Sequence, residues 1–318
     1  MLESLLSAWE NVLQASIAID SRDDLGEAPF WQASLQRLIW SDISAGVVHE
    51  ARCGGATGWQ ETRRWELGRH IGAALPREKG GLVVVAGTDI VFLSDEGKSS
   101  PFVRLKADPN LVTFNDAKCD SRGRLWAGTS ATDLSSKRGS LYRVDLDGTV
   151  TSMLDGVTLS NGMDWSPDEK IFYYIDSCTR TVGAFDFDAV KGLISNRRTV
   201  IEIPAGGGLL DGMAVDREGC IWVAVAGIGE IRRYAPDGLL RGCVTVPAPF
   251  GTSCAFGGPD GGDLFITSVK MDYPDEVLAV LAPFGLNVEG SKKRSTESGS
   301  LFVCRPGVTG RAATPFGG

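Results

Sequence analysis

Glu27, Asn115, Asn161 and Asp211 are the residues whose types and spacing could do chemistry together. Each stands ten or eleven residues before an apolar segment. Carboxylate and amide oxygens are the ligands that hard cations prefer. Asn and Asp at the start of strands also form turn hydrogen bonds, but four of them at one register favour a shared role. The pattern predicts a site for one divalent cation, provided that the fold brings the four side chains together.

The apolar segments that follow these residues recur along the whole chain. Six of them follow a Gly or Asp turn, and the starting points of successive segments are 43 to 50 residues apart. A period of about 45 residues of strand-rich units is typical of a β-propeller, in which each repeat forms one blade of about four strands. The sequence therefore predicts an all-β fold, a six-bladed β-propeller. The six anchors are Leu38, Leu82, Leu125, Ile171, Ile221 and Leu264.

The symmetry of such a fold would bring the four oxygen-bearing residues to one place. Equivalent positions of successive blades lie on a ring around the propeller axis, so these side chains are expected at one mouth of the central channel. The corresponding residues of the second and sixth blades are Gly72 and Cys254. A strand at residues 16–20 is expected to pair with the strand near residues 301–303 and close the ring, which removes two open edges.

Radial repetition lets one domain grow beyond the usual size of a single core, so residues 1–318 are expected to form one domain. Residues 1–13 are predicted to be an N-terminal appendage with apolar residues at helical spacing. The second blade is expected at roughly residues 65–102. Residues 270–298 exceed the length of a hairpin loop and are predicted to be an insertion at the rim, with a helix near residues 274–281.

Composition excludes several classes of function. The formal net charge of -8 disfavours a nucleic-acid partner, which needs a positive field. The N-terminus shows no signal peptide and no membrane span, which favours a cytoplasmic protein. The seven cysteines are odd in number and lack a CxxC spacing, so they are predicted to be reduced.

The remaining conspicuous residues are predicted to be structural. Only two histidines, His49 and His70, occur in the chain, which disfavours a His-rich zinc site or a Ser-His-Asp relay. Each is expected to be structural or solvent-facing. The core between blades is predicted to contain Trp31, Trp126, Trp165, Trp222, Met163 and Met213.

Five segments carry motifs that go beyond the strand pattern. They are Leu-Gly-Glu-Ala-Pro-Phe-Trp at 25–31, Phe-Asn-Asp-Ala-Lys-Cys-Asp at 114–120, Ser-Asn-Gly-Met-Asp-Trp-Ser at 160–166, Leu-Asp-Gly-Met-Ala-Val-Asp at 210–216 and Pro-Phe-Gly-Thr-Ser-Cys-Ala-Phe-Gly-Gly at 249–258. These segments resemble the signature segments of the regucalcin (senescence marker protein), gluconolactonase and luciferin-regenerating enzyme family. The resemblance covers about residues 20–305.

The resemblance implies a six-bladed propeller that binds one divalent cation and hydrolyses sugar-type lactones. By position, Glu27, Asn161 and Asp211 match the metal ligands of that family. Asn115 matches its substrate-contacting Asn, and Asp211 also matches the proposed general base. The family often has Arg two residues before that Asn, where this chain has Thr113. An Arg fork of five donors grips substrate oxygens, so Thr113 makes the choice of substrate the open question.

The leading hypothesis from the sequence is therefore a metal-dependent lactone hydrolase, in which Asp211 accepts the proton of an activated water. Calcium, magnesium, manganese and zinc all suit the predicted ligands. A related enzyme for a non-sugar lactone, an ester or a biosynthetic intermediate is the first alternative. A metal-binding propeller without enzyme activity is the second, because one fold hosts many functions.

Overall fold

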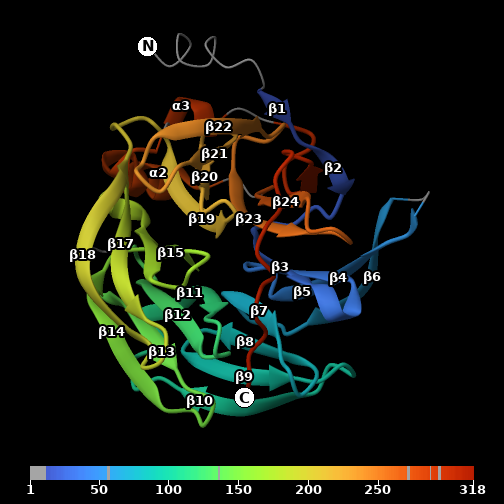
Figure 1. The fold of residues 1–318 in the computed structure, drawn as a ribbon, viewed down its shortest axis with the longest axis vertical. Coiled ribbons are helices and arrows are strands. Elements are labelled where there is room, and N and C mark those ends of the chain that lie inside the picture. Colours follow the sequence, from blue (N-terminus) through green and yellow to red (C-terminus); the bar gives the residue numbers. More distant parts are fainter. Residues whose placement is uncertain (1–11, 56–57, 135–136, 271–272, 287, 293–294) are drawn as a thin grey trace.

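The computed structural model describes residues 12–55, 58–134, 137–270, 273–286, 288–292 and 295–318. Its strands form six sheets of four or five strands, arranged around a central channel (Figure 1). The innermost strand of each sheet contacts the innermost strands of both neighbouring sheets. The predicted six-bladed β-propeller is therefore confirmed.

Each blade is an antiparallel sheet whose strands follow one another from the channel outward, except at the ring closure. The first blade comprises β3 (Gly26–Gln32), β4 (Arg37–Asp42), β5 (Val47–Cys53) and β6 (Trp59–Glu66). The second comprises β7 (Ala73–Pro76), β8 (Leu82–Ala86), β9 (Asp89–Leu93) and β10 (Ser99–Arg104), and the third β11 (Val112–Cys119), β12 (Leu125–Ala131), β13 (Gly139–Val144) and β14 (Val150–Val157). The fourth comprises β15 (Ser160–Trp165), β16 (Ile171–Asp176), β17 (Thr181–Asp188) and β18 (Leu193–Glu202). The fifth comprises β19 (Leu209–Val215), β20 (Ile221–Ala226), β21 (Glu230–Tyr234) and β22 (Leu240–Thr245), and the sixth β23 (Gly251–Gly257), β24 (Asp263–Ser268) and β25 (Leu301–Cys304).

The beginning of the chain completes two blades. Strand β2 (Ser16–Ile19) pairs with β25 and forms the outer edge of the sixth blade, as predicted. Strand β1 (Leu13–Gln14) pairs in parallel with β22 at the edge of the fifth blade. Leu13, which the sequence placed in the appendage, thus belongs to a blade, and the rest of that appendage up to residue 11 lies outside the described residues. Trp65, expected in the second blade, lies in the outer strand of the first.

The segment between β24 and β25 contains the helices α2 (Asp275–Leu281), η4 (Ala282–Phe284) and α3 (Val288–Ser291). It contains the helix predicted near residues 274–281. Two further short helices, η1 (Ala33–Leu35) and η3 (Ser177–Thr179), connect strands within the first and fourth blades. Among the described residues, no helix is long and apolar enough to cross a membrane.

Aromatic side chains fill the interfaces between blades, because a blade alone leaves both faces apolar. Trp126 of the third blade meets Trp165 of the fourth edge-to-face, with ring centroids 5.9 Å apart. Trp222 of the fifth blade meets Phe256 of the sixth in the same way at 5.7 Å. The predicted core role is confirmed for Trp31, Trp126, Trp165, Trp222, Met163 and Met213, all of which are buried.

The C-terminal segment, residues 309–318, forms a strap across the ring (Figure 1). The Thr309 carbonyl accepts a hydrogen bond from the Arg217 amide of the fifth blade. At the other end, the Phe316 amide donates to the Pro76 carbonyl of the second blade. The Phe316 ring is fully buried beside Phe92 and Phe102. The strap therefore ties blades together that are far apart in the sequence.

Replacement of Phe316 by Ala should lower the free energy of unfolding by about 3 kcal/mol, because a fully buried aromatic ring would leave a cavity. Urea denaturation measures this loss. Phe316→Leu, which keeps most of the apolar volume, should cost less than half as much. A loss below about 0.5 kcal/mol for Phe316→Ala, the level of an ordinary surface substitution, would show that the strap does not stabilise the ring.

Candidate functional site

The predicted ring residues lie on the inner strands of four blades. Glu27 lies in β3, Asn115 in β11, Asn161 in β15 and Asp211 in β19. In all four strands the pairing register shifts at or beside this residue. Such a β-bulge re-aims side chains, and it is over-represented next to active sites. The bulges explain why equivalent positions of four blades turn polar side chains toward the channel.

Glycines next to the ring residues bring the inner strands unusually close. A Cβ atom on Gly162 would lie 2.6 Å from the Asp211 carbonyl oxygen of the neighbouring blade. A Cβ atom on Gly212 would lie 2.5 Å from that of Ser253 in the next blade. Any side chain at these two positions would push the strands apart. The glycines therefore keep the channel narrow where the polar residues converge.

Three carboxylates share this narrow space. Burial raises the pKa of Glu27 well above its usual value, and the charges of Asp211 and Asp116 raise it further. Burial and the charge of Asp116 likewise raise the pKa of Asp211. Burial raises the pKa of Asp116 itself to about 6. The charges of Asp211 and Asp116 thus act on Glu27, and that of Asp116 acts on Asp211, which makes the three carboxylates neighbours.

Two amides complete the ring. The Asn115 Nδ2 group donates to the Asn161 Oδ1 atom at 3.1 Å and to the Ser160 carbonyl oxygen at 2.8 Å. The Asn161 Nδ2 group donates to the Ser177 hydroxyl at 2.8 Å. These bonds fix which way both amides point, so the Asn161 Oδ1 atom keeps its second lone pair for another partner.

The donor set fits a divalent cation. A positive charge stabilises the ionised forms of carboxylates whose pKa values are raised by burial and by neighbouring negative charge. Glu27, Asp211 and the Asn161 Oδ1 atom provide oxygen ligands of the kind that calcium, magnesium and manganese prefer. Among the described residues, no cluster of three or more His, Cys, Asp or Glu side chains meets the geometric criteria for a metal site. The ligand set predicted here, Glu27, Asn161 and Asp211, is not a cluster of that type, because its third ligand is the amide oxygen of an Asn.

A layer of ion pairs lies farther along the channel. The Lys118 ammonium group is 2.9 Å from Asp164 Oδ2 and also donates to the Met213 carbonyl oxygen at 3.0 Å. Arg311 of the strap lies 3.3 Å from Asp164 Oδ1. These cations hold the pKa of Asp164 below its usual value despite burial. The strap side of the channel is therefore closed by paired charges, and the unbalanced negative charge is at the opposite mouth.

Tyr273, from the insertion between β24 and β25, reaches the ring. Burial raises the pKa of its phenol, and the charges of Asp211 and Glu27 add to the shift. Its ring contacts that of Phe250, with centroids 5.3 Å apart. These contacts place Tyr273 near Glu27 and Asp211, at the carboxylate end of the channel. They agree with the expectation that the insertion lies at the rim.

Thr113 lies beside this mouth, two residues before Asn115. Its hydroxyl is 3.4 Å from the Nδ1 atom of His70, which comes from the blade before. Partial desolvation lowers the pKa of His70 below its usual value. Thr113 and His70 together form a polar side of the mouth.

Sequence reasoning missed Asp116 and Tyr273. Asp116 follows Asn115 directly, and strict strand alternation would have turned it away from the channel. The register shift between Phe114 and Asp116 removes that alternation. Tyr273 lies in an insertion outside the repeat, so no blade register points to it. The signal that could have found Asp116 was its presence in the quoted Phe-Asn-Asp motif.

The predictions for the histidines and cysteines hold. His49 is buried between Asp23 and Glu61, at 3.2 and 2.9 Å, and stacks on Trp40, so it is structural. His70 is exposed. All seven cysteines lie in the described part of the chain and are free thiols.

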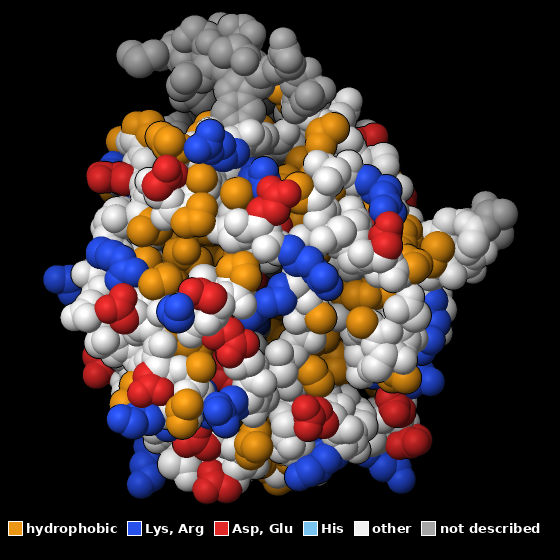
Figure 2. All heavy atoms as spheres, in the orientation of Figure 1, with side chains coloured by type: hydrophobic (Ala, Val, Ile, Leu, Met, Phe, Trp, Pro, Cys, Tyr) orange, Lys and Arg blue, Asp and Glu red, His pale blue; other side chains and the backbone are white. Residues whose placement is uncertain are grey.

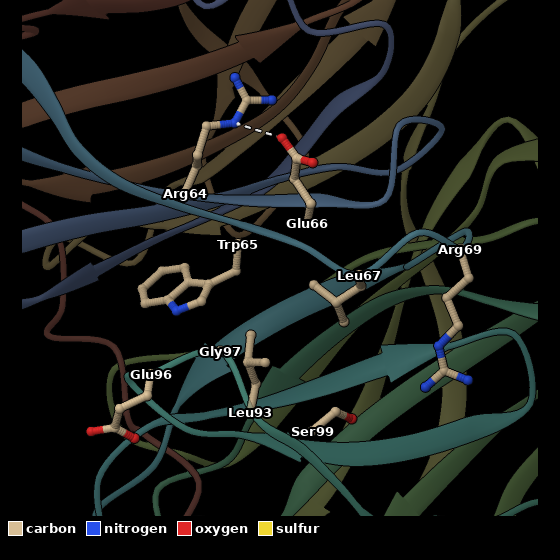
Figure 3. Close-up of a pocket in the computed structure, with 9 residues that line it drawn as sticks. All are labelled: Arg64, Trp65, Glu66, Leu67, Arg69, Leu93, Glu96, Gly97 and Ser99. Atoms are coloured by element: carbon tan, nitrogen blue, oxygen red, sulfur yellow. Dashed lines mark ion pairs between the residues drawn. The ribbon is translucent and has the colours of Figure 1, made fainter.

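A groove on the outside of the propeller is not part of this site. It has a volume of about 510 Å³ and lies between the outer strands of the first and second blades (Figure 3). Arg64 and Glu66, which line it, face each other across 3.7 Å. None of the ring residues lines this groove. The face of the molecule in Figure 2 carries acidic and basic side chains interspersed, with no extended basic patch of the kind that a nucleic acid would need.

Comparison with known proteins agrees with the geometry. Residues 25–270 match the family described as the SMP-30/Gluconolactonase/LRE-like region. The chain belongs to this family. It is 37% identical to regucalcin of Danio rerio, over 84% of this chain and 90% of that protein. It is 30% identical to the putative sugar lactone lactonase YvrE of Bacillus subtilis, over 96% of this chain and 99% of that protein.

Solved structures show the same fold. A luciferin-regenerating enzyme superposes on the chain with a TM-score of 0.83 at 27% sequence identity, covering 95% of this chain and 99% of that one. The family resemblance found in the sequence motifs is therefore confirmed, and with it the six-bladed propeller.

Glu27→Gln, Asn161→Ala and Asp211→Asn should each weaken binding of a divalent cation about tenfold or more, because each removes or neutralises an oxygen ligand. Isothermal titration calorimetry with calcium, magnesium, manganese and zinc measures the affinities. Asp186→Asn, which changes an exposed carboxylate on an outer strand, is the matched control. Unchanged affinity in all three ring variants would exclude the assigned ligands.

The same carboxylates should make stability depend on pH. Their pKa values in the folded protein lie above the usual 3.8 for Asp and 4.5 for Glu, so the folded state binds more protons than the unfolded one. The free energy of unfolding of the metal-free protein should therefore fall as pH rises from about 4 through the Asp116 pKa of about 6. A saturating divalent cation should reverse this fall, because binding requires ionised ligands. The test compares metal-free wild type with Asp211→Asn: the melting temperature of wild type relative to the variant should fall from pH 4.5 to 7, and a difference that does not change with pH would contradict the shared acidic site.

Proposed function

We propose that this protein is a divalent-metal-dependent hydrolase of small lactones. The observation that carries the proposal is the group of three carboxylates at one mouth of the channel, with Glu27 and Asp211 buried and Asp116 half-buried, together with the Asn115–Asn161 amide pair. Membership of a family that includes gluconolactonases supports the reaction class. The similarity to a putative sugar lactone lactonase supports the substrate class.

Glu27, Asn161 and Asp211 would hold the cation, whose chemistry is to polarise the lactone carbonyl and to lower the pKa of a water molecule. The reaction adds this water to the carbonyl carbon and breaks the ring C–O bond, which yields a hydroxy acid. Asp211 would accept the water proton, in the role of a general base.

Asn115 would position the substrate or the water. Both of its Nδ2 hydrogens point to protein acceptors, Ser160 and Asn161. Its Oδ1 atom is therefore the group that can receive a hydrogen bond from outside. A hydroxyl or a water molecule is the partner that this geometry favours.

A second candidate is a related enzyme acting on a non-sugar lactone, an ester or a biosynthetic intermediate with the same site. Thr113 favours it, because its short hydroxyl lies beside His70 where an Arg fork would grip a polyhydroxylated ring. A metal-binding propeller without enzyme activity remains the alternative that an assay decides.

Hydrolysis of a lactone panel, followed by pH-stat titration, tests the proposal. Activity should require a divalent cation and disappear with a chelator. Asp211→Asn should lower kcat/KM by roughly 100-fold or more, the usual contribution of a general base, and Asp186→Asn should not change it. Cation binding without hydrolysis of any lactone or ester would support the binding propeller instead.

Thr113→Arg should raise kcat/KM for gluconolactone roughly tenfold, because a guanidinium adds charge-assisted hydrogen bonds to ring hydroxyls. Thr113→Leu, which fills space without donors, is the matched control and should give no gain. The prediction is wrong if wild-type protein already prefers gluconolactone over every other lactone and Thr113→Arg leaves the ranking unchanged.

A further inference from the structure

The six residues that stand two positions before Glu27, Asn115, Asn161, Asp211 and the equivalent Gly72 and Cys254 lie near the start of the inner strands. A polyol substrate would need charged or multidentate donors among these residues. Three of the six are leucines, and none is Arg, Lys, Asp or Glu. The six are Leu25, His70, Thr113, Leu159, Leu209 and Thr252.

The three leucines are on one side of the mouth and belong to a single apolar cluster with the insertion. Leu209 is buried in it, together with Phe250 and the helix residue Leu278. Leu25 and Leu159 pack against the same cluster and stay half-buried, as does Tyr273. The cluster thus has an interior under helix α2 and a partly open edge at the carboxylates. We call Leu25, Leu159, Leu209 and Tyr273 the apolar wall.

Backbone contacts anchor the insertion that completes this wall. The Gly208 amide, next to Leu209, donates to the Gly285 carbonyl oxygen at 3.1 Å. The Val269 amide donates to the Phe250 carbonyl oxygen at 3.2 Å. Helix η4 also contacts η3, whose Ser177 hydroxyl accepts from Asn161. The apolar wall is therefore anchored to residues beside the inner strands β19 and β23 and to the short helix η3, which also contacts Asn161.

The opposite side of the mouth differs. Thr113 and His70 are polar there and lie 3.4 Å apart, and neither is a fixed charge of the kind that Arg or Lys would supply. The mouth is therefore divided into an apolar side, above Glu27, Asn161 and Asp211, and a polar side beside Asn115. A substrate that suits both sides has an uncharged polar head and one apolar substituent.

We propose that the preferred substrates are neutral lactones with an alkyl or aryl substituent on the ring, seated against the apolar wall. The inference rests on the proposed lactone hydrolysis and specifies its substrate class. Apolar contact of this kind contributes in proportion to the area removed from water. Three carboxylates at the mouth also disfavour an anionic substituent, because like charges repel in a partly buried site.

A series of δ-lactones with growing alkyl chains tests the substrate class. From δ-valerolactone to δ-decanolactone, kcat/KM should rise about fourfold for each methylene that the wall covers. δ-Gluconolactone should be a poorer substrate than δ-decanolactone. A flat series, or a preference for δ-gluconolactone over all alkyl lactones, would overturn the proposal while leaving lactone hydrolysis established.

Variants of the wall provide the second test. Tyr273→Ala should lower the ratio of kcat/KM for δ-decanolactone to that for δ-valerolactone roughly tenfold, because an aromatic surface is lost. Tyr273→Phe keeps the ring and should keep the ratio. Val280→Ser, on the exposed side of helix α2, is the matched control and should also keep it. An unchanged ratio in Tyr273→Ala would remove Tyr273 from the wall.

Binding of unreactive lactams separates this inference from the proposed reaction. The dissociation constants of δ-valerolactam and of an alkyl-substituted δ-lactam can be measured by calorimetry in the presence of cation, whether or not any lactone is hydrolysed. Tighter binding of the alkyl lactam, lost in Tyr273→Ala and kept in Tyr273→Phe, supports the apolar wall even if turnover is absent. Equal affinities for the two lactams would overturn the wall on their own.

Discussion

Repulsion among three neighbouring carboxylates is the constraint on which the site depends. The charges of Asp211 and Asp116 raise the pKa of Glu27, and the charge of Asp116 raises that of Asp211, so these groups would move apart if the surrounding backbone allowed it. The ring of inner strands prevents this movement. Gly162 and Gly212 let adjacent blades approach within the reach of a Cβ atom, and the strap links blades across the ring. A ring of blades that closes on itself can keep like charges together where an open array of sheets would relax.

Charge is distributed in layers along the channel for the same reason. Toward the strap, Lys118 and Arg311 neutralise Asp164 with protein cations. At the opposite mouth the acidic residues outnumber such partners, and Lys118 lowers the pKa of Asp116 only in part. The protein thus neutralises Asp164 with its own cations but leaves negative charge without a cationic partner around Glu27 and Asp211. Uncompensated negative charge that a rigid frame holds in place favours binding of an external cation.

The repeat explains how much of this could be predicted from the sequence. The blade period and the register of Glu27, Asn115, Asn161 and Asp211 are properties of the repeating unit, so counting from each apolar segment located them. Asp116 was not predicted, because a β-bulge changes the direction in which consecutive side chains point. The alternation pattern of the sequence does not reveal where such a bulge occurs. Tyr273 was not predicted, because it lies in an insertion that is not part of the blade repeat. The position of its side chain depends on tertiary packing.

The acidic ring residues and the residues two positions before them have different proposed roles: the first bind the cation, and the second contact the substituent of the substrate. The acidic layer is fixed by bulges and by glycines that admit no side chain, so few substitutions there would keep the ring intact. The layer two residues earlier lies at the ends of the same strands, where Leu25, Thr113 and Leu159 are half-buried and have room to differ in size and polarity. Substitution in this outer layer changes which substituent is bound without moving an oxygen ligand. Because the outer layer is set by strand ends and by one insertion, we expect propellers with the same ring to differ in the lactones that they accept, and the proposed preference of this protein for apolar lactones depends on Thr113 and Tyr273.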